Sequence, residues 1–278
     1  MSDKKGKPSS RRLVLGPYRG EVGAGFDDPL FIDFIARPEE VLAGPESELL
    51  FEGRNRVGAV RIALSSGMSR DLVVKEFSPR GLIRLKSLVQ PSKAAKAWRG
   101  ALALEERSLG TASPVAYLEK RRHGLVERCY FFATRVGGAA EVRGLFRGLP
   151  SAELEPLLAA LAAFLRRCHD RGILHRDLSD GNILVRKDER GGSLFYLLDT
   201  NRIRIRSRLG GFRRSKNLIR LGIPPASQKH FLGCYFGSTP PRRAHWLWYR
   251  LNKIVFTATV GAKKKLRLRR FARFLRIQ

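Results

Sequence analysis

Acidic residues are missing from the whole of the sequence after Asp199. Lys and Arg number 21 in that stretch, so the last 79 residues carry a formal charge of +21, whereas the first 199 residues carry only +8. Such an unbalanced basic surface favours a polyanionic partner: nucleic acid, an anionic membrane or a phosphorylated glycolipid. The charge alone does not choose among these partners.

Cysteine and long apolar runs are also scarce. Cys129, Cys168 and Cys234 are an odd, widely spaced set without a CxxC pair, which argues against both a disulfide framework and a zinc site. No run approaches the roughly 18–20 apolar residues that a membrane span needs. Residues 1–12 are polar and basic, which is not the pattern of a secretory signal. We therefore expect a protein of the cytoplasm that is soluble or peripheral to a membrane.

The order of segments predicts three parts. Residues 1–16 are expected to form a flexible basic tail. In residues 17–136, short apolar segments separated by Gly, Ser and Asn predict a small lobe with an antiparallel sheet and one helix from Ser92 to about Leu109. Residues 137–278 are expected to form a mainly helical lobe with a basic C-terminal region. The predicted fold class is therefore α+β, with two lobes joined at Gly137-Gly138.

The clearest predicted helix begins with Ser151 as its cap and ends at Gly172. Its leucines recur at helical spacing, and acidic residues lie in its first turn, where the helix dipole favours negative charge. The basic C-terminal region is expected to contain three further helices, at Lys216–Leu221, Pro241–Phe256 and Lys263–Ile277.

The most informative segment follows that helix, at His175–Leu184. It reads His-Arg-Asp-Leu-Ser-Asp-Gly-Asn-Ile-Leu and matches the catalytic-loop pattern of protein kinases. Phosphoryl transfer needs a carboxylate that orients the attacking hydroxyl and takes its proton, and an oxygen ligand that helps to hold Mg²⁺. Asp177 is therefore predicted to be the base and Asn182 a metal ligand. The alternative is a polar turn in which the Asp only caps the backbone. That alternative would explain a His-x-Asp triplet by itself, but it does not explain the full His175–Leu184 string, which is preceded by a helix and followed by an apolar strand.

A second carboxylate, Asp199, ends an apolar strand 17 residues after Asn182. Kinases place their main metal-binding carboxylate at such a position, so Asp199 is predicted to be the second metal ligand. An Asp at the end of an isolated strand would more simply cap a turn. The metal-binding role is favoured here because Asp199 follows the catalytic loop at the separation seen in kinases. The usual Asp-Phe-Gly is replaced by Asp199-Thr200-Asn201-Arg202.

Lys75 lies inside an apolar strand, where its ammonium needs a partner. We predict that it binds nucleotide phosphates, although an edge-strand Lys facing water is the simpler alternative. Its carboxylate partner should come from the Ser92–Leu109 helix, where Glu105 and Glu106 are the two acids and Glu105 is the one chosen. Gly53 and Gly58 bound the candidate phosphate-covering loop, which is not a GxGxxG motif. Together these residues predict a two-lobed protein-kinase-like fold.

The sequence resembles the lipopolysaccharide kinase (Kdo/WaaP) family within the kinase-like superfamily. The likeness rests on Val74–Phe77, the helix with Trp98 followed by Gly110–Pro114, the loop His175–Leu184, and Leu198–Arg202. The resemblance implies ATP and Mg²⁺ as cofactors and a heptose or Kdo hydroxyl of the lipopolysaccharide inner core as acceptor. It also implies a peripheral location on the cytoplasmic face of the inner membrane.

Two other functions remain open at this point. An atypical protein kinase or small-molecule phosphotransferase would use the same core residues. A non-catalytic kinase-like module could dock on a membrane or nucleic acid through the basic C-terminal region, but retention of Lys75, Asp177, Asn182 and Asp199 disfavours it. Aromatic and cationic residues are mixed from Arg242 onward, which suits an anionic membrane interface, although a helix of the lobe with a solvated basic face would show the same mixture. Nucleic acid is disfavoured because no binding motif accompanies the charge.

Overall fold

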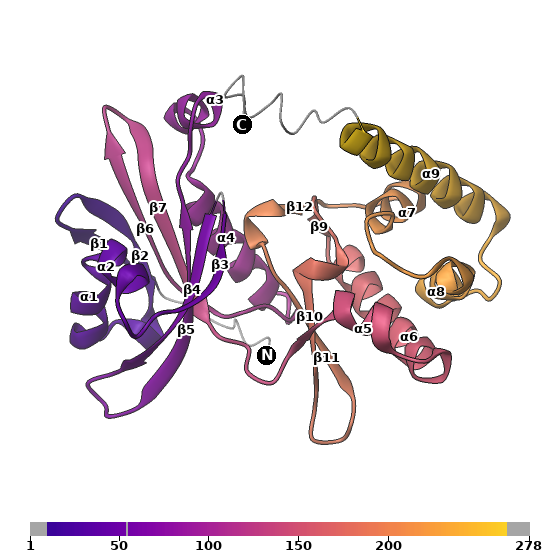
Figure 1. Ribbon diagram of the computed structural model, residues 1–278, viewed down its shortest axis with the longest axis horizontal. Coiled ribbons are helices and arrows are strands. Elements are labelled where there is room, and N and C mark those ends of the chain that lie inside the picture. Colours follow the sequence, from indigo (N-terminus) through magenta and orange to yellow (C-terminus); the bar gives the residue numbers. More distant parts are fainter. Residues whose placement is uncertain (1–9, 54, 266–278) are drawn as a thin grey trace, which may run out of the picture. The chain divides into compact units, whose positions relative to one another are not determined.

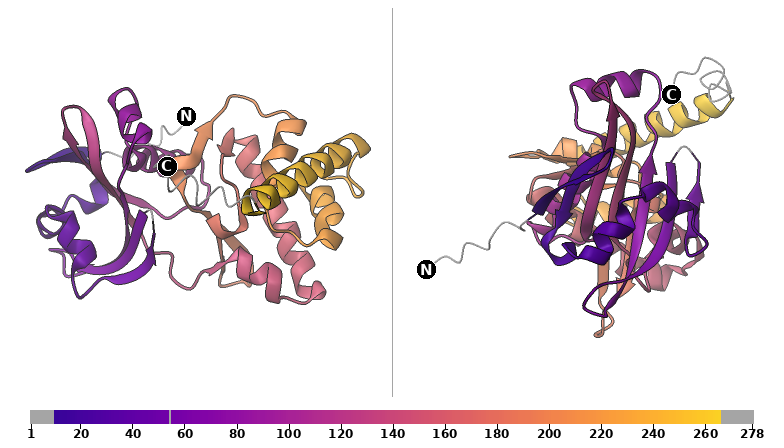
Figure 2. Two further views of the ribbon diagram at one scale, coloured as in Figure 1. Left: turned by 45° about the horizontal axis from the view of Figure 1, so that its top comes forward. Right: turned by 90° about the vertical axis from the view of Figure 1, so that its left-hand side faces the viewer.

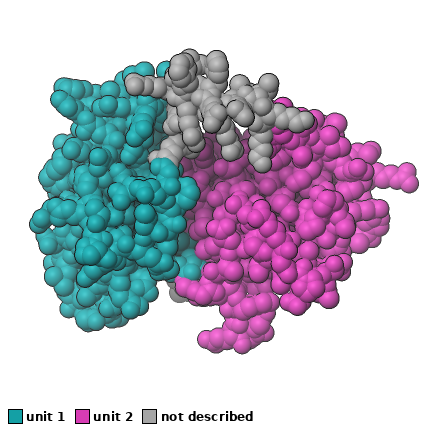
Figure 3. Space-filling view, viewed as in Figure 1, with its two compact units in different colours: residues 1–106, 112–136, 276–278 teal, residues 107–111, 137–275 magenta. Residues whose placement is uncertain are grey.

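The computed structural model describes residues 10–53 and 55–265 and contains two compact units (Figures 1 and 3). Of the described residues, those up to Glu106 and those from Ala112 to Val136 form unit 1. Unit 2 consists of Arg107–Thr111 together with the described residues from Gly137 onward. The predicted α+β class is confirmed, because unit 1 is built on an antiparallel sheet and unit 2 is mainly helical.

The sheet of unit 1 has seven strands, which lie side by side in Figures 1 and 2. Every neighbouring pair is antiparallel. In spatial order the strands are β1 (Ser10–Leu15), β2 (Tyr18–Gly23), β6 (Pro114–Arg122), β7 (Leu125–Thr134), β5 (Ser69–Phe77), β4 (Asn55–Ala63) and β3 (Glu48–Glu52).

Helices cover both faces of this sheet (Figure 1). Helices α1 (Pro29–Ile35) and α2 (Pro38–Ala43) bury Phe31 and Leu42 on one face. Helix α4 (Lys93–Glu105) buries Trp98 against the other. Because side chains alternate along a strand, β5 presents its residues to the two faces in turn.

The prediction of a flexible tail over residues 1–16 is wrong for its second part, which is a strand of the sheet. Residues Ser10–Leu15 form β1, which pairs with β2 over its whole length. Leu13 is buried in the core beneath α1 and α2, and this burial together with the ladder of backbone hydrogen bonds explains why the segment is ordered. Residues 1–9 lie outside the described part of the chain.

Helix α4 confirms Ser92 as its cap, since the Ser92 side chain accepts a hydrogen bond from the backbone N–H of Ala95 at 3.0 Å. The helix ends at Glu105, four residues earlier than the predicted Leu109. The next residues, Arg107–Thr111, belong to unit 2.

Unit 2 is organised around α6 (Ser151–Asp170), whose Leu154, Leu158, Leu161 and Leu165 are buried as the helical spacing predicts. The helix begins with Pro150, not Ser151, as its cap residue. Three small β elements carry the predicted catalytic segments. These are the β10–β11 hairpin (Ile183–Lys187 and Ser193–Leu197), the pair of β9 (Ile173–His175) with β12 (Ile203–Ile205), and β8 (Ala140–Glu141) beside β10.

The basic C-terminal region contains three helices within the described residues: α7 (Gly211–Leu218), α8 (Gln228–Phe236) and α9 (Arg243–Lys265). The sequence patterns miss α8 and place α7 about five residues too late. Helix α9 runs beside α7 (Figure 2) and continues nine residues past the predicted end at Phe256. The predicted helix Lys263–Ile277 lies mostly outside the described residues. None of the described helices combines the length and apolar character that crossing a bilayer requires.

Candidate active site

The loop after β9 holds Asp177 and Asn182 in a fixed relation. The backbone carbonyl of Asp177 accepts hydrogen bonds from the Asn182 side-chain Nδ2 and the Ser179 backbone N–H, both at 2.8 Å. The Asn182 backbone N–H donates to the Ser179 carbonyl at 3.0 Å. Both side chains are partly exposed. The loop therefore anchors Asp177 through its backbone carbonyl and does not use its carboxylate.

His175 ties this loop to the segment that carries Asp199. The His175 ring is 2% exposed, and its Nδ1 accepts from the backbone N–H of Asp177 at 3.2 Å. The other ring nitrogen, Nε2, lies 2.9 Å from the Leu198 carbonyl, so it carries the proton and donates it. Burial lowers the pKa of His175, which favours the neutral ring that this pair of bonds requires.

Asn182 and Asp199 flank the same end of the β10–β11 hairpin. Strand β10 begins at Ile183, directly after Asn182, and Ile183 pairs with Leu197 at the end of β11. The Leu198 backbone N–H donates to the Asn182 carbonyl at 2.9 Å, which extends the pairing by one step. Asp199 then adopts a left-handed backbone conformation with a φ of 55° and ends the strand. Two oxygen-bearing side chains are thus presented from adjacent backbone segments.

Residues Gly110 and Thr111 hold β11 in place, a role that the sequence patterns do not reveal. The Thr111 hydroxyl donates to the Leu197 carbonyl at 3.0 Å, and the Leu197 N–H donates to the Gly110 carbonyl at 2.9 Å. A side chain on Gly110 would place its Cβ 1.9 Å from the Phe195 carbonyl oxygen, so only glycine fits there. The signal that could have found this contact is the Gly110–Pro114 string itself.

A buried polar chain supports the catalytic loop from the helices of unit 2. Asn217 of α7 donates its side-chain N–H to the His175 carbonyl at 2.9 Å, and its Oδ1 lies 3.0 Å from Nε2 of His169. Nδ1 of His169 lies 2.5 Å from the hydroxyl of Tyr235 on α8. Burial lowers the pKa of His169 to about 4, which keeps its ring neutral near pH 7. These buried contacts give His169 a structural role.

The predicted nucleotide-binding residues Lys75 and Glu105 lie in unit 1. Lys75 is on β5 opposite Val57 and Phe131, on the face that α4 covers, and its ammonium lies 5.3 Å from the centre of the Phe77 ring. Glu105 is the exposed last residue of α4 and makes no ion pair within the described part of the chain. Its role as the partner of Lys75 stays a prediction.

The two glycines of the candidate phosphate loop have different surroundings. Gly53 is in the turn between β3 and β4. Gly58 is inside β4, paired with Val74, so it faces away from Lys75. A Cβ on Gly58 would come within 2.8 Å of the Leu42 side chain of α2, and this close approach explains the glycine without a phosphate.

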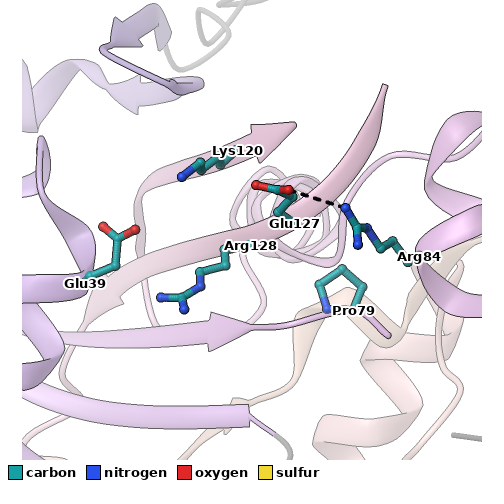
Figure 4. A pocket seen from close by; sticks show the side chains of 6 residues that line it. All are labelled: Glu39, Pro79, Arg84, Lys120, Glu127 and Arg128. Carbon is teal, nitrogen blue, oxygen red and sulfur yellow. Dashed lines mark hydrogen bonds and ion pairs between the residues drawn. The ribbon is translucent and has the colours of Figure 1, made fainter. Parts of the chain in front are cut away.

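A charged pocket of about 390 Å³ in unit 1 contains none of the predicted site residues (Figure 4). It is lined by Glu39, Pro79, Arg84, Lys120, Glu127 and Arg128. Arg84 and Glu127 face each other in an ion pair of 3.4 Å, as the dashed line in Figure 4 shows. Because acids and bases are mixed along its wall, the pocket has no strong preference for a ligand of one charge.

The donor set at the hairpin end suits a hard divalent cation. Carboxylate and amide oxygens are the ligands that Mg²⁺ accepts in proteins, usually completed by phosphate oxygens and water. Within residues 10–53 and 55–265 no cluster of three His, Cys, Asp or Glu side chains could hold a metal alone. Asn182 and Asp199 each supply a side-chain oxygen of this kind.

Comparisons with known proteins give the chain its family. The sequence profile described as the lipopolysaccharide kinase (Kdo/WaaP) family matches residues 79–226, slightly more than half of the chain. The fold is similar to a solved structure described as WaaP in complex with acyl carrier protein, with a TM-score of 0.55 and 18% identity. That match covers 78% of this chain and 91% of the other, and it confirms the kinase-like fold. No curated protein matches the sequence. The chain thus belongs to the lipopolysaccharide kinase (Kdo/WaaP) family and is an ATP-using phosphotransferase that acts on a sugar hydroxyl.

Proposed function

We propose that this kinase transfers the γ-phosphoryl group of Mg²⁺-bound ATP to a heptose or Kdo hydroxyl of the lipopolysaccharide inner core. The observation that carries the proposal is the backbone linkage at the β10–β11 hairpin end. The Asn182 side chain donates to the Asp177 carbonyl, and the Asn182 carbonyl accepts from the N–H of Leu198, the residue before Asp199. An acceptor base and two cation ligands are what transfer to an alcohol requires.

Each residue has a defined part in the proposed reaction. Asp177 orients the acceptor hydroxyl and takes its proton as the oxygen bonds to the γ-phosphorus, while the bond from that phosphorus to the β–γ bridging oxygen breaks. Asn182 and Asp199 would hold Mg²⁺, which supplies charge neutralisation for the phosphates when bound. Lys75, with Glu105 as its predicted partner, would bind the α- and β-phosphates, and the backbone at Gly53 would cover them. The packing of Gly58 against α2 favours a structural role for that glycine.

The acceptor can be tested in cells of the source organism. Deletion of the gene is expected to remove one phosphate from the lipopolysaccharide core, and the intact gene should restore it, whereas the Asp177→Asn variant should not. Tandem mass spectrometry of the released core locates the phosphate on heptose or on Kdo. An unchanged core phosphate content after deletion would contradict the acceptor assignment and favour a protein or a small molecule as acceptor.

Helix α9 supports an anionic membrane as the surface on which this substrate is met. Leu247, Leu251, Ile254 and Val255 are each more than half exposed and follow one stripe of the helix. The exposed Arg243 and Arg250 lie on the same helix, and the described residues after Asp199 include no acid. An apolar stripe bordered by cations fits the interface of an anionic bilayer. The proposed membrane is the inner membrane, at its cytoplasmic face, where a substrate of the lipopolysaccharide core would be met.

A sedimentation assay with lipid vesicles tests this docking. The parent protein should pellet with phosphatidylglycerol vesicles and not with phosphatidylcholine vesicles. Replacement of both Leu251 and Ile254 by Ser should lower binding by at least 10-fold, because each side chain contributes about 1.5–3 kcal/mol on full burial. Leu194→Ser, at an exposed leucine of the β10–β11 hairpin, is the matched control. Equal binding of the double variant and the control would contradict the proposed surface.

A further inference from the structure

Arg220 makes an ion pair with the carboxylate that we assign as the base. Its Nη1 donates a hydrogen bond to Oδ1 of Asp177, although the two residues are 43 positions apart. Both side chains are partly exposed, at 41% and 35%. Ion pairs this accessible usually contribute at most about 1 kcal/mol to stability. Stability alone is therefore a weak explanation for the contact.

The backbone on both sides of Arg220 is fixed by α9. The ammonium of Lys253 donates to the carbonyls of Ile219 and Leu221, each at 2.7 Å. Leu221 is fully buried and Ile219 nearly so, so the turn is also anchored by packing. Partial burial lowers the pKa of Lys253, because the ammonium loses part of its hydration there. The two charge-assisted hydrogen bonds offset that loss and leave only the Arg220 side chain projecting from the turn.

The guanidinium of Arg220 is also positioned from α9. The ring of Phe256 lies 5.4 Å from the guanidinium carbon, within the range of a cation–π contact. Phe256 and Lys253 are on the inward stripe of the helix, three residues apart, and point to the same turn. Both residues follow the segment that matches the family profile, which ends at residue 226. Helix α9 thus positions the Arg220 guanidinium beside Asp177 of the catalytic loop.

A cation at this position answers an electrostatic need of the proposed reaction. The transferring phosphoryl group and the Asp177 carboxylate are both negative, and they must approach each other. Arg176 is the one cation in the loop His175–Leu184, and residues 178–181, between Asp177 and Asn182, are Leu-Ser-Asp-Gly and add none. Arg presents several N–H donors in a planar fork, so one guanidinium can bind a carboxylate and a phosphate oxygen together.

We propose that Arg220 is a catalytic residue that bridges the Asp177 carboxylate and the phosphoryl group in transfer, with Lys253 and Phe256 as its positioning residues. The proposal rests on the assignment of Asp177 as the base. Arg220 orients the carboxylate before the acceptor binds and stabilises the charge on the phosphoryl oxygens as the transfer proceeds. Its contribution is greatest in the transition state, so it should act on kcat more than on KM.

Kinetics of Arg220→Gln with deacylated core oligosaccharide as acceptor test the proposal. We expect kcat to fall about 100- to 1000-fold, the usual effect of removing one transition-state donor, with KM for ATP changed much less. Guanidinium ion added to Arg220→Ala should restore part of the lost rate. Phe256→Leu, which keeps an apolar side chain without the ring, should lower kcat by a smaller factor. Arg213→Gln, at an exposed arginine of α7, is the matched control and should keep the parent rate and show no response to guanidinium.

A binding measurement separates catalysis from structure. In calorimetry, Arg220→Gln should bind Mg²⁺–ADP like the parent but lose affinity for Mg²⁺–ADP with aluminium fluoride, a mimic of the phosphoryl group in transfer. A parent-like kcat in Arg220→Gln would overturn the proposal, as would a loss of kcat with equal loss of ADP affinity and no response to guanidinium. If Asp177→Asn is inactive while Arg220→Gln is not, only this inference fails. If Asp177→Asn is fully active, the proposed function fails first.

Discussion

Asp177→Asn is expected to lower the rate of phosphoryl transfer by about 100- to 10,000-fold, the usual contribution of a positioned base. Asn keeps the size of the side chain but cannot take the proton of the acceptor hydroxyl. The hydrogen bonds that the Asn182 side chain and the Ser179 backbone N–H donate to the Asp177 carbonyl do not involve the side chain that changes, so the loop should keep its conformation. The rate is measured with purified protein, ATP and deacylated core oligosaccharide.

The control for this variant is a carboxylate at the other end of the same hairpin. Asp188 accepts backbone hydrogen bonds from Arg190 and Gly192 in the β10–β11 turn, and Asn can make the same bonds. Asp188→Asn should therefore transfer phosphate at the parent rate. The melting temperature of Asp177→Asn should lie close to that of the parent, since its partly exposed ion pair with Arg220 adds little stability. Parent-like transfer by Asp177→Asn would remove Asp177 from the mechanism.

Asp199→Asn is expected to abolish most Mg²⁺-dependent nucleotide binding. Loss of a group that merely supports a metal ligand costs about 10–100-fold in metal affinity, and removal of a charged ligand should cost at least as much. Asn is the informative replacement because it tolerates the left-handed backbone of Asp199, so the φ of 55° adds no new strain. Calorimetric titration of a non-hydrolysable ATP analogue, with and without Mg²⁺, measures the effect.

Metal concentration separates loss of a ligand from loss of structure. If Asp199 holds the cation, the remaining activity of Asp199→Asn should rise with Mg²⁺ far above the level that saturates the parent. Thr111→Ser keeps the hydroxyl that bonds the Leu197 carbonyl and serves as a control for changes next to β11. Identical Mg²⁺ dependence in Asp199→Asn and the parent would exclude Asp199 as a ligand.

The loop and hairpin that carry the proposed site residues could be predicted because their geometry is largely local. Asp177 and Asn182 are five residues apart in one loop, and Asn182 and Asp199 are joined by a single hairpin. Hydrophobic alternation identifies the two strands of that hairpin, so adjacent placement of their flanking residues follows from antiparallel pairing. For these residues, recognising the hairpin was sufficient.

The contacts that hold the segment could not be predicted, because they join distant parts of the chain. Nothing distinguishes Arg220 among the 21 basic residues after Asp199 until the fold brings it to Asp177. The link from Thr111 to Leu197 spans 86 positions. The prediction of a flexible tail missed strand β1 for a similar reason. The strand is stabilised by its pairing with β2 and by burial of Leu13 in the core, and neither contact can be recognised in its own basic sequence.

One transfer assay tests the central claim most directly. Core oligosaccharide is released from a strain that lacks the gene and is then deacylated. It is incubated with the purified protein and Mg²⁺–ATP, and the mass of the sugar product is measured by mass spectrometry. The parent should add one phosphoryl group to a heptose or Kdo residue, and Asp177→Asn should add almost none in the same time. An oligosaccharide that gains no mass with the parent, or gains it equally fast with Asp177→Asn, would contradict the account.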